Sequence, residues 1–232
     1  MKRFWTTVTL DDDRAVQLDG KPVRTPGRVP LALPSATLAE AVAEEWRAVV
    51  GEIDPRTMPM TGLANAAIDR ITPDPLLFAQ GLAAYAESDL LCYRADSPED
   101  LVALQAAAWD PLLDWARTRY DVHIEVTTGI LHVAQPVATL ARLGDAIAAR
   151  GPYELAALSP IVTIGGSLIA ALALAERAAT PEQVWDAVTL DEEFQAERWG
   201  RDPLAEAGIE TRRREFAAGV RLLTLISPAA GG

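Results

Sequence analysis

The chain has 232 residues, 50% of them hydrophobic, so it is long enough to bury a core in one large or two modest domains. Its 33 acidic and 21 basic residues give a net charge of −12 at pH 7. This negative charge argues against nucleic acid and anionic membranes as partners, and it favours a basic or neutral protein surface.

Cysteine usage and the start of the chain indicate the compartment. Cys92 is the only cysteine, which excludes an internal disulfide and fits a reducing environment. Its apolar neighbours predict that it is buried. The first residues, Met-Lys-Arg-Phe-Trp-Thr, lack the apolar run of a signal peptide and the long basic, serine-rich tract of an organelle presequence. We therefore expect a cytoplasmic protein.

Residues 1–55 have the pattern of a small α+β domain, in which a twisted antiparallel sheet carries one helix. Short β-prone segments are broken by turn residues, and Asp19-Gly20 between two of them is a hairpin signal. A helix then begins near Ser35 or Thr37, either of which can cap it, and it ends at Gly51. Its apolar stripe consists of Leu38, Val42, Trp46 and Val49.

Residues 56–232 are predicted to form a mostly helical domain, an orthogonal bundle. The stretch Asp89–Trp115 is typical of one helix end, a tight connection and a second helix. Pro111 predicts a kink or a restart in the second helix, with Asp110 available as its cap. A β-hairpin is expected near residues 122–133, where apolar and polar residues alternate.

The run Leu155–Ala175 contains no charged residue and is long enough to cross a bilayer. It also contains small and polar residues and has little positive charge beside it, unlike a spanning helix. We predict one buried central helix, in which Gly165 and Gly166 mark the close approach of a neighbour. A peripheral membrane protein that uses this run remains an alternative.

Motifs of catalysis are missing from the sequence. No phosphate-binding loop, dinucleotide fingerprint or hydrolase elbow occurs. The two histidines, His123 and His132, favour sheet-surface positions over a zinc site, and we expect no metal and no cofactor. Asp110 and Asp114 are weak evidence of acid–base chemistry, because carboxylates in solvated or capping positions are common.

Seven motifs, in the same order along nearly the whole chain, resemble a family of ATP synthase assembly chaperones that attend the α subunit of the catalytic F(1) head. The motifs are Leu18-Asp-Gly-Lys-Pro-Val-Arg-Thr-Pro26, Glu44-Glu45-Trp46, Met58-Pro-Met-Thr, Ala67-Ile-Asp-Arg70, Asp89-Leu-Leu-Cys-Tyr-Arg94, Trp109-Asp-Pro111 and Asp191-Glu-Glu-x-Gln-x-Glu-x-Trp-Gly200. The resemblance implies a small α+β domain followed by an orthogonal helical bundle, in agreement with the residue patterns.

The resemblance also implies a non-enzymatic role. Such a chaperone holds the unassembled α subunit so that its interface for the β subunit does not aggregate. Mitochondrial members carry a presequence that this chain lacks, so a bacterial, cytoplasmic protein is expected. We also expect a monomer. An enzyme of unknown reaction that uses an acidic cluster is the alternative, and activity screening would distinguish it.

The acids Asp191, Glu192, Glu193 and Glu197 form the candidate partner-binding site. Thr189 is expected to cap a helix here, and acids in a first turn suit the helix dipole. Two of the acids, however, are four residues apart, where like charges repel mildly on a helix. Local stability therefore does not explain the cluster.

Phe194 and Trp199 are expected to point inward, which leaves the acids exposed as a negative patch. Because this motif is among the most recognisable of the family, we hypothesise that the patch contacts the α subunit.

Overall fold

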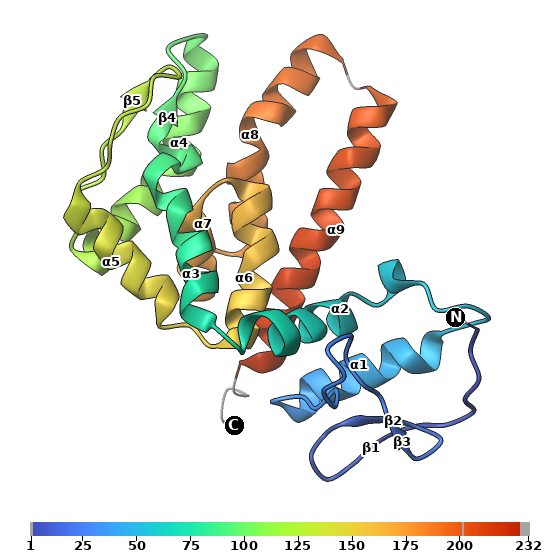
Figure 1. Cartoon of the computed structure of the whole chain (residues 1–232). Helices are drawn as coiled ribbons and strands as arrows, with labels where there is room; N and C mark the ends of the chain where they lie inside the picture. Colours follow the sequence, from blue (N-terminus) through green and yellow to red (C-terminus); the bar gives the residue numbers. More distant parts are fainter. Residues whose placement is uncertain (1, 201, 228–232) are drawn as a thin grey trace, which may run out of the picture. The chain divides into compact units, whose positions relative to one another are not determined.

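The computed structural model describes residues 2–200 and 202–227 and divides into two compact units (Figure 1). Unit 1 comprises residues 1–75, 151–157 and 218–232, and unit 2 comprises residues 76–150 and 158–217. Unit 1 thus extends past the predicted boundary at residues 55–56 and includes two later segments of the chain. The fold class is the predicted one, a small antiparallel sheet with a helical region.

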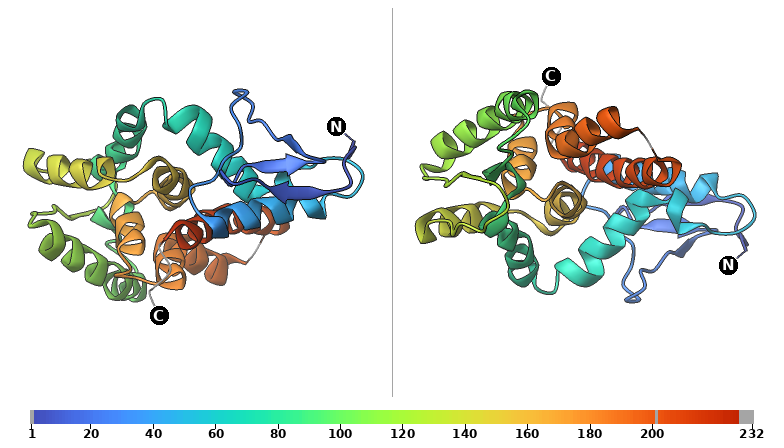
Figure 2. Two further views of the ribbon diagram at one scale, coloured as in Figure 1. Left: turned by 90° about the horizontal axis from the view of Figure 1, so that it is seen from below. Right: turned by 90° about the horizontal axis from the view of Figure 1, so that it is seen from above.

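Unit 1 begins with a three-stranded antiparallel sheet of order β1-β2-β3. The elements are β1 (Val8–Leu10), β2 (Val16–Leu18), β3 (Lys21–Pro22) and α1 (Ala36–Ala48). Asp19 and Gly20 both have positive φ, as the tight hairpin between β2 and β3 requires. Helix α1 contacts β1 and β2 and buries Leu38 and Val42 (Figure 2). Ser35 caps the helix by accepting a hydrogen bond from the Leu38 N–H.

Two carboxylates explain why the segment after residue 55 belongs to unit 1. This segment contains η1 (Pro55–Thr57), α2 (Pro59–Ala66) and the π-helical η2 (Ala67–Ile71). Glu45 of α1 accepts hydrogen bonds from the Met60 and Thr61 N–H groups (2.7 and 2.8 Å), and so caps the start of α2. Asp69 accepts from the Gly27 N–H at 2.7 Å and holds the turn after β3.

Most of unit 2 is helical. Its elements, three of which also contain residues of unit 1, are α3 (Pro75–Ala83), η3 (Ala84–Ser88), η4 (Leu90–Cys92), β4 (Tyr93–Arg94), α4 (Glu99–Tyr120), β5 (Thr127–Thr128), α5 (Val137–Ala148), α6 (Pro152–Gly165), α7 (Leu168–Ala175), α8 (Pro181–Trp199) and α9 (Pro203–Ile226). Helix α7 contacts α4, α5 and α8 and supplies much of the core. Helix α4 runs through Pro111 without the predicted restart, and Asp110 pairs with Arg94 instead of capping. Cys92 is buried, as predicted.

The uncharged run Leu155–Ala175 forms two helices rather than the single central helix that we predicted. Gly166 adopts φ +62°, a left-handed conformation that ends α6. The hydroxyl of Ser167 then accepts a hydrogen bond from the Ala170 N–H at 3.0 Å and starts α7. The predicted close approach occurs at Gly165, where an added Cβ would lie 3.0 Å from Val188, but not at Gly166, where the nearest atom, Leu90 Cβ, would lie 3.8 Å away. Within the described residues, no helix is both long and apolar enough to span a membrane.

In place of the hairpin expected near residues 122–133, β5 pairs in parallel with β4. Thr127 lies opposite Tyr93, and Thr128 lies opposite Arg94. The side chain of Gln135 bonds both the N–H and the C=O of Glu125, at 3.0 and 2.9 Å. These contacts satisfy backbone groups that a hairpin would otherwise have paired.

A fully buried carboxylate, that of Asp89, joins the start of η4 to the break between α6 and α7. Its two oxygens accept hydrogen bonds from the Leu91 N–H (3.1 Å) and the Ile169 N–H (3.0 Å). Next to it, the Leu90 N–H donates to the Gly166 carbonyl at 2.9 Å. Burial raises the pKa of Asp89 to about 6, although hydrogen bonds from Ile169, Ser167 and Leu91 oppose this rise.

We expect Asp89→Asn to lower the free energy of unfolding by about 1–3 kcal/mol, because its NH2 group must face a backbone N–H that now has no acceptor. Since the folded state raises the pKa of Asp89, the folded protein holds this proton to higher pH than the unfolded chain. The stability that Asp89 contributes therefore falls as pH rises from about 4 to about 6. In urea unfolding, the free energy of unfolding of wild type should exceed that of Asp89→Asn by more at pH 5 than at pH 7.5. An equal difference at the two pH values would contradict a raised pKa of Asp89.

We expect Gly166→Ala to destabilise the protein by roughly 1–2 kcal/mol, because a side chain disfavours the left-handed conformation. The space itself is adequate, since the nearest atom, Leu90 Cβ, lies 3.8 Å from the added carbon. Gly81→Ala is the matched control: it lies in α3 with nothing within 4 Å, and it should stabilise by about 0.5–1 kcal/mol. Thermal melts measure both, and similar changes in the two variants would exclude backbone strain as the cause.

Candidate functional site

The N-terminal half of α8 packs on α4, and the indole of Trp109 fixes this contact. Trp109 is fully buried, and its Nε1 donates to the Ala187 carbonyl at 2.7 Å. The guanidinium of Arg94 lies over the Trp109 ring, 5.1 Å from its centroid, and donates to Asp110 at 2.6 Å. Two of the motifs singled out in the sequence thus form one contact, which holds α8 in position.

A pocket of about 290 Å³ opens where α4, α8 and the end of α6 meet in unit 2. It is lined by Leu90, Trp109, Thr163, Ile164, Gly165, Gly166, Val188, Asp191 and Glu192. Apolar side chains and two glycines form most of this lining, and Thr163 and two carboxylates complete it. The volume suits one side chain of a partner better than a large cofactor. The chemistry favours an apolar group that lies beside a cation or a hydrogen-bond donor.

Asp191, one of the two acids in this lining, is held in place by a buried side chain. Gln105 of α4 is 2% exposed, and its Nε2 donates to Asp191 Oδ1 at 2.8 Å. The amide oxygen of Gln105 accepts from the Ala95 N–H, also at 2.8 Å. The Gln105 amide thus has a partner at each end, which limits the rotation of the carboxylate that it holds.

Glu192, the second acid, is paired across the unit with α9. Arg212 Nη2 lies 2.7 and 2.8 Å from its two carboxylate oxygens. Both side chains are partly exposed, so solvent screens the pair, and we expect it to contribute little to stability. Its effect is to fix the position of the Glu192 carboxylate at the pocket.

The other two predicted site residues do not line the pocket. Glu193 is half-buried, and Glu197 is exposed further along α8. The structure therefore brings together Asp191 and Glu192, which lie beside each other at the pocket, and leaves Glu193 and Glu197 outside it.

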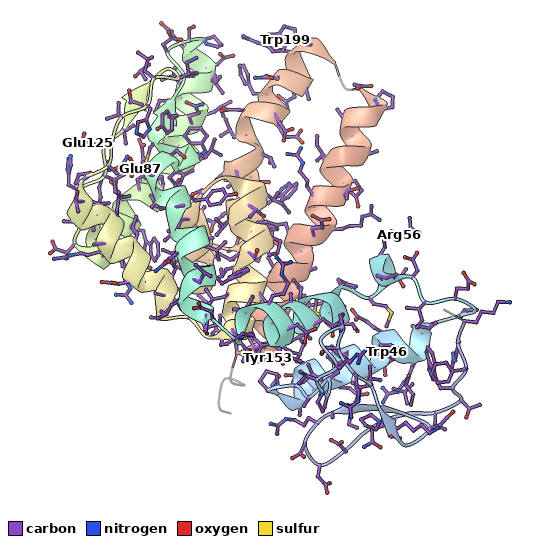
Figure 3. All side chains as sticks on the ribbon, in the orientation of Figure 1. Trp46, Arg56, Glu87, Glu125, Tyr153 and Trp199 are labelled. Atoms are coloured by element: carbon purple, nitrogen blue, oxygen red, sulfur yellow. The ribbon has the colours of Figure 1, made fainter. Side chains whose placement is uncertain are left out.

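Two local expectations at this site were wrong. Thr189 does not start a helix: α8 is continuous from Pro181, and the buried Thr189 hydroxyl donates to the Trp185 carbonyl at 2.8 Å. The acids therefore lie in the C-terminal half of α8, where the helix dipole does not favour them. Trp199 is 78% exposed at the end of α8 and does not anchor the helix inward (Figure 3).

Unit 2 carries most of the negative charge. It contains 21 of the 33 acidic residues and 11 of the 21 basic residues, which gives a net charge of −10. A basic partner surface would thus be attracted to unit 2 in particular.

The sequence gives no local signal for Gln105 and Arg212, the residues that fix the two acids. Their partners, Asp191 and Glu192, are distant in the chain.

The carboxylates weighed for acid–base chemistry have basic partners. Asp110 pairs with Arg94, and Asp114 pairs with Arg117 at 2.9 Å. His123 and His132 each lie beside a glutamate. Over residues 2–200 and 202–227, no cluster of three or more His, Cys, Asp or Glu side chains is arranged to hold a metal ion.

Comparison with known proteins identifies the family. A model of the ATP12 chaperone protein family matches residues 2–117. A curated relative, the mitochondrial protein atp12 of Schizosaccharomyces pombe, is 23% identical over 214 residues, or 86% of this chain and 74% of the relative.

Solved structures agree over nearly the whole chain. The crystal structure of Atp12 from Paracoccus denitrificans matches with a TM-score of 0.91 and 42% identity, over 97% of this chain and 98% of that one. The Atu1473 protein from Agrobacterium tumefaciens matches with a TM-score of 0.90 and 37% identity, over 97% and 86% of the two chains. The chain therefore belongs to the ATP12 chaperone family.

Proposed function

We propose that this protein is an assembly chaperone that binds the unassembled α subunit of the ATP synthase catalytic head and prevents its aggregation before it pairs with the β subunit. The observation that carries the proposal is the family match, since a 42% identical Atp12 covers 97% of this chain at a TM-score of 0.91. An unassembled subunit exposes an apolar interface, and such surfaces aggregate unless they are covered.

We assign the α-subunit contact to the acidic residues of α8, Asp191, Glu192, Glu193 and Glu197. The first two support this assignment by their geometry, because they lie at an apolar pocket and are held there by Gln105 and Arg212. In this arrangement a basic side chain of the client pairs with the acids while an adjacent apolar side chain enters the pocket. Carboxylates fixed before binding lose little conformational entropy when the partner arrives.

We further propose that the protein acts as a monomer in a bacterial cytoplasm and has no catalytic role. The solved relatives come from Paracoccus denitrificans and Agrobacterium tumefaciens, which supports a bacterial source.

Direct capture tests the function. The chain should co-purify with the α subunit from native cytoplasm, and it should keep purified α subunit soluble after dilution from urea. Purified β subunit is the control and should gain no solubility. Equal protection of both subunits, or of neither, would reject the α-specific role.

The double variant Asp191→Asn and Glu192→Gln tests the acidic contact. It removes both charges but keeps an oxygen that can accept from Gln105 and Arg212, so the melting temperature should change little. The rate of association with the α subunit should fall by roughly threefold or more at low salt, and the difference should shrink at about 0.5 M salt.

The matched control is Glu210→Gln with Glu215→Gln, two exposed acids of α9 whose loss changes the net charge equally. If both double variants slow association to the same extent, overall charge and not the α8 site would be responsible.

A further inference from the structure

The chain contains a second long uncharged run, and this one lies at the surface. Residues 126–141 contain no Asp, Glu, Lys or Arg, in a chain of which 23% is charged. The run Leu155–Ala175 is largely buried, but here Ile130 is 97% exposed, Leu131 79% and Val137 82%. Solvent-exposed apolar runs without charged residues are binding surfaces or aggregation hazards, because water solvates them poorly.

Within the described residues, the backbone of this run is also without hydrogen bonds over five consecutive residues, Ile130–Ala134, which we call the open segment. Backbone pairing stops at Gly129, whose N–H donates to the Arg94 carbonyl at 2.8 Å. The next anchor along the chain is the side chain of Gln135, which bonds the backbone N–H and C=O of Glu125. In the described parts of the chain, no backbone N–H or C=O of the open segment has a hydrogen-bond partner.

A side chain nevertheless holds the open segment in place. The ring of His132 lies 3.1 Å from the Tyr93 hydroxyl through Nδ1 and 3.4 Å from Glu87 through Nε2. Figure 3 labels Glu87, which lies on η3. The segment is therefore tethered in its middle and at both ends, while its backbone groups and its apolar side chains remain available.

We propose that the open segment is a docking strand, which binds an extended apolar segment of an unassembled client chain by backbone hydrogen bonding. Unpaired N–H and C=O groups are matched by a partner whose own backbone is unpaired, which an extended chain supplies and a folded surface does not. Because residues 126–141 contain no charged side chain and Ile130 and Leu131 are exposed, apolar side chains of the partner are favoured here. The proposal rests on the chaperone role proposed above but not on the identity of the client.

Two glutamates at the most exposed apolar positions of the open segment test the side-chain contact. The variant Ile130→Glu with Leu131→Glu should weaken binding about tenfold, because charge replaces apolar contact. The control is Leu76→Glu with Leu77→Glu, an equally adjacent pair in α3 that is 61% and 64% exposed. It should bind within about twofold of wild type.

Two probes separate this proposal from the choice of client. One is the ATP synthase α subunit diluted from urea, and the other is reduced, carboxymethylated lysozyme, which remains unfolded. If wild type binds the unfolded lysozyme but not the α subunit, and the Ile130 and Leu131 variant loses that binding, the docking-strand proposal is supported and the proposed α-subunit role is rejected. If the variant binds both probes as wild type does, the docking strand is rejected.

Hydrogen exchange of the intact protein tests the backbone contact. Amides of residues 130–134 should exchange fast in the free protein and become protected in the complex with the α subunit or, if that subunit does not bind, with the unfolded lysozyme. Binding without protection there would overturn strand pairing.

Sedimentation gives a separate check. Self-association of wild type that the Ile130 and Leu131 variant abolishes would assign the segment to a contact between two copies, and would also reject the proposal.

Discussion

The buried carboxylate of Asp89 is the constraint on which the candidate site in unit 2 depends. It bonds the Leu91 N–H and the Ile169 N–H, groups that lie about eighty residues apart in the chain. The break between α6 and α7 at Gly166 leaves backbone donors that need an acceptor, and the buried carboxylate of Asp89 supplies it. Leu90, Gly165 and Gly166, which line the pocket, lie directly beside this junction.

The same device recurs in both units: a polar side chain satisfies backbone or amide groups of a distant segment. Glu45 caps α2, Asp69 holds the Gly27 turn, and Gln105 links Ala95 to Asp191. Each of these bonds connects segments that no local sequence rule would join. Since an unmade buried hydrogen bond costs more than a made one contributes, such pairs specify the arrangement of segments more than they add stability.

The two uncharged runs show how similar composition can serve opposite purposes. Leu155–Ala175 builds much of the core, because its backbone is satisfied by helices and its side chains pack on α4, α5 and α8. Residues 126–141 instead leave apolar side chains and unpaired backbone at the surface. In a chaperone, the acidic pocket and the open segment would make complementary contributions: fixed charges speed the encounter, and apolar and backbone contacts slow release.

The sequence by itself determined the elements whose signals are local. The Asp19-Gly20 hairpin, the Ser35 cap of α1, the α+β class and the seven family motifs could all be found within short windows, because turn and capping chemistry acts over a few residues. Tertiary structure decided the rest. Contacts between distant residues determine the break at Gly166, the parallel pairing of β5 and the assignment of residues 56–75 to unit 1. They also determine that Asp191 and Glu192 line the pocket while Glu193 and Glu197 do not. The helical periodicity of the sequence cannot reveal that Asp89 accepts a hydrogen bond from the Ile169 N–H, because the two residues meet only when the core forms around them.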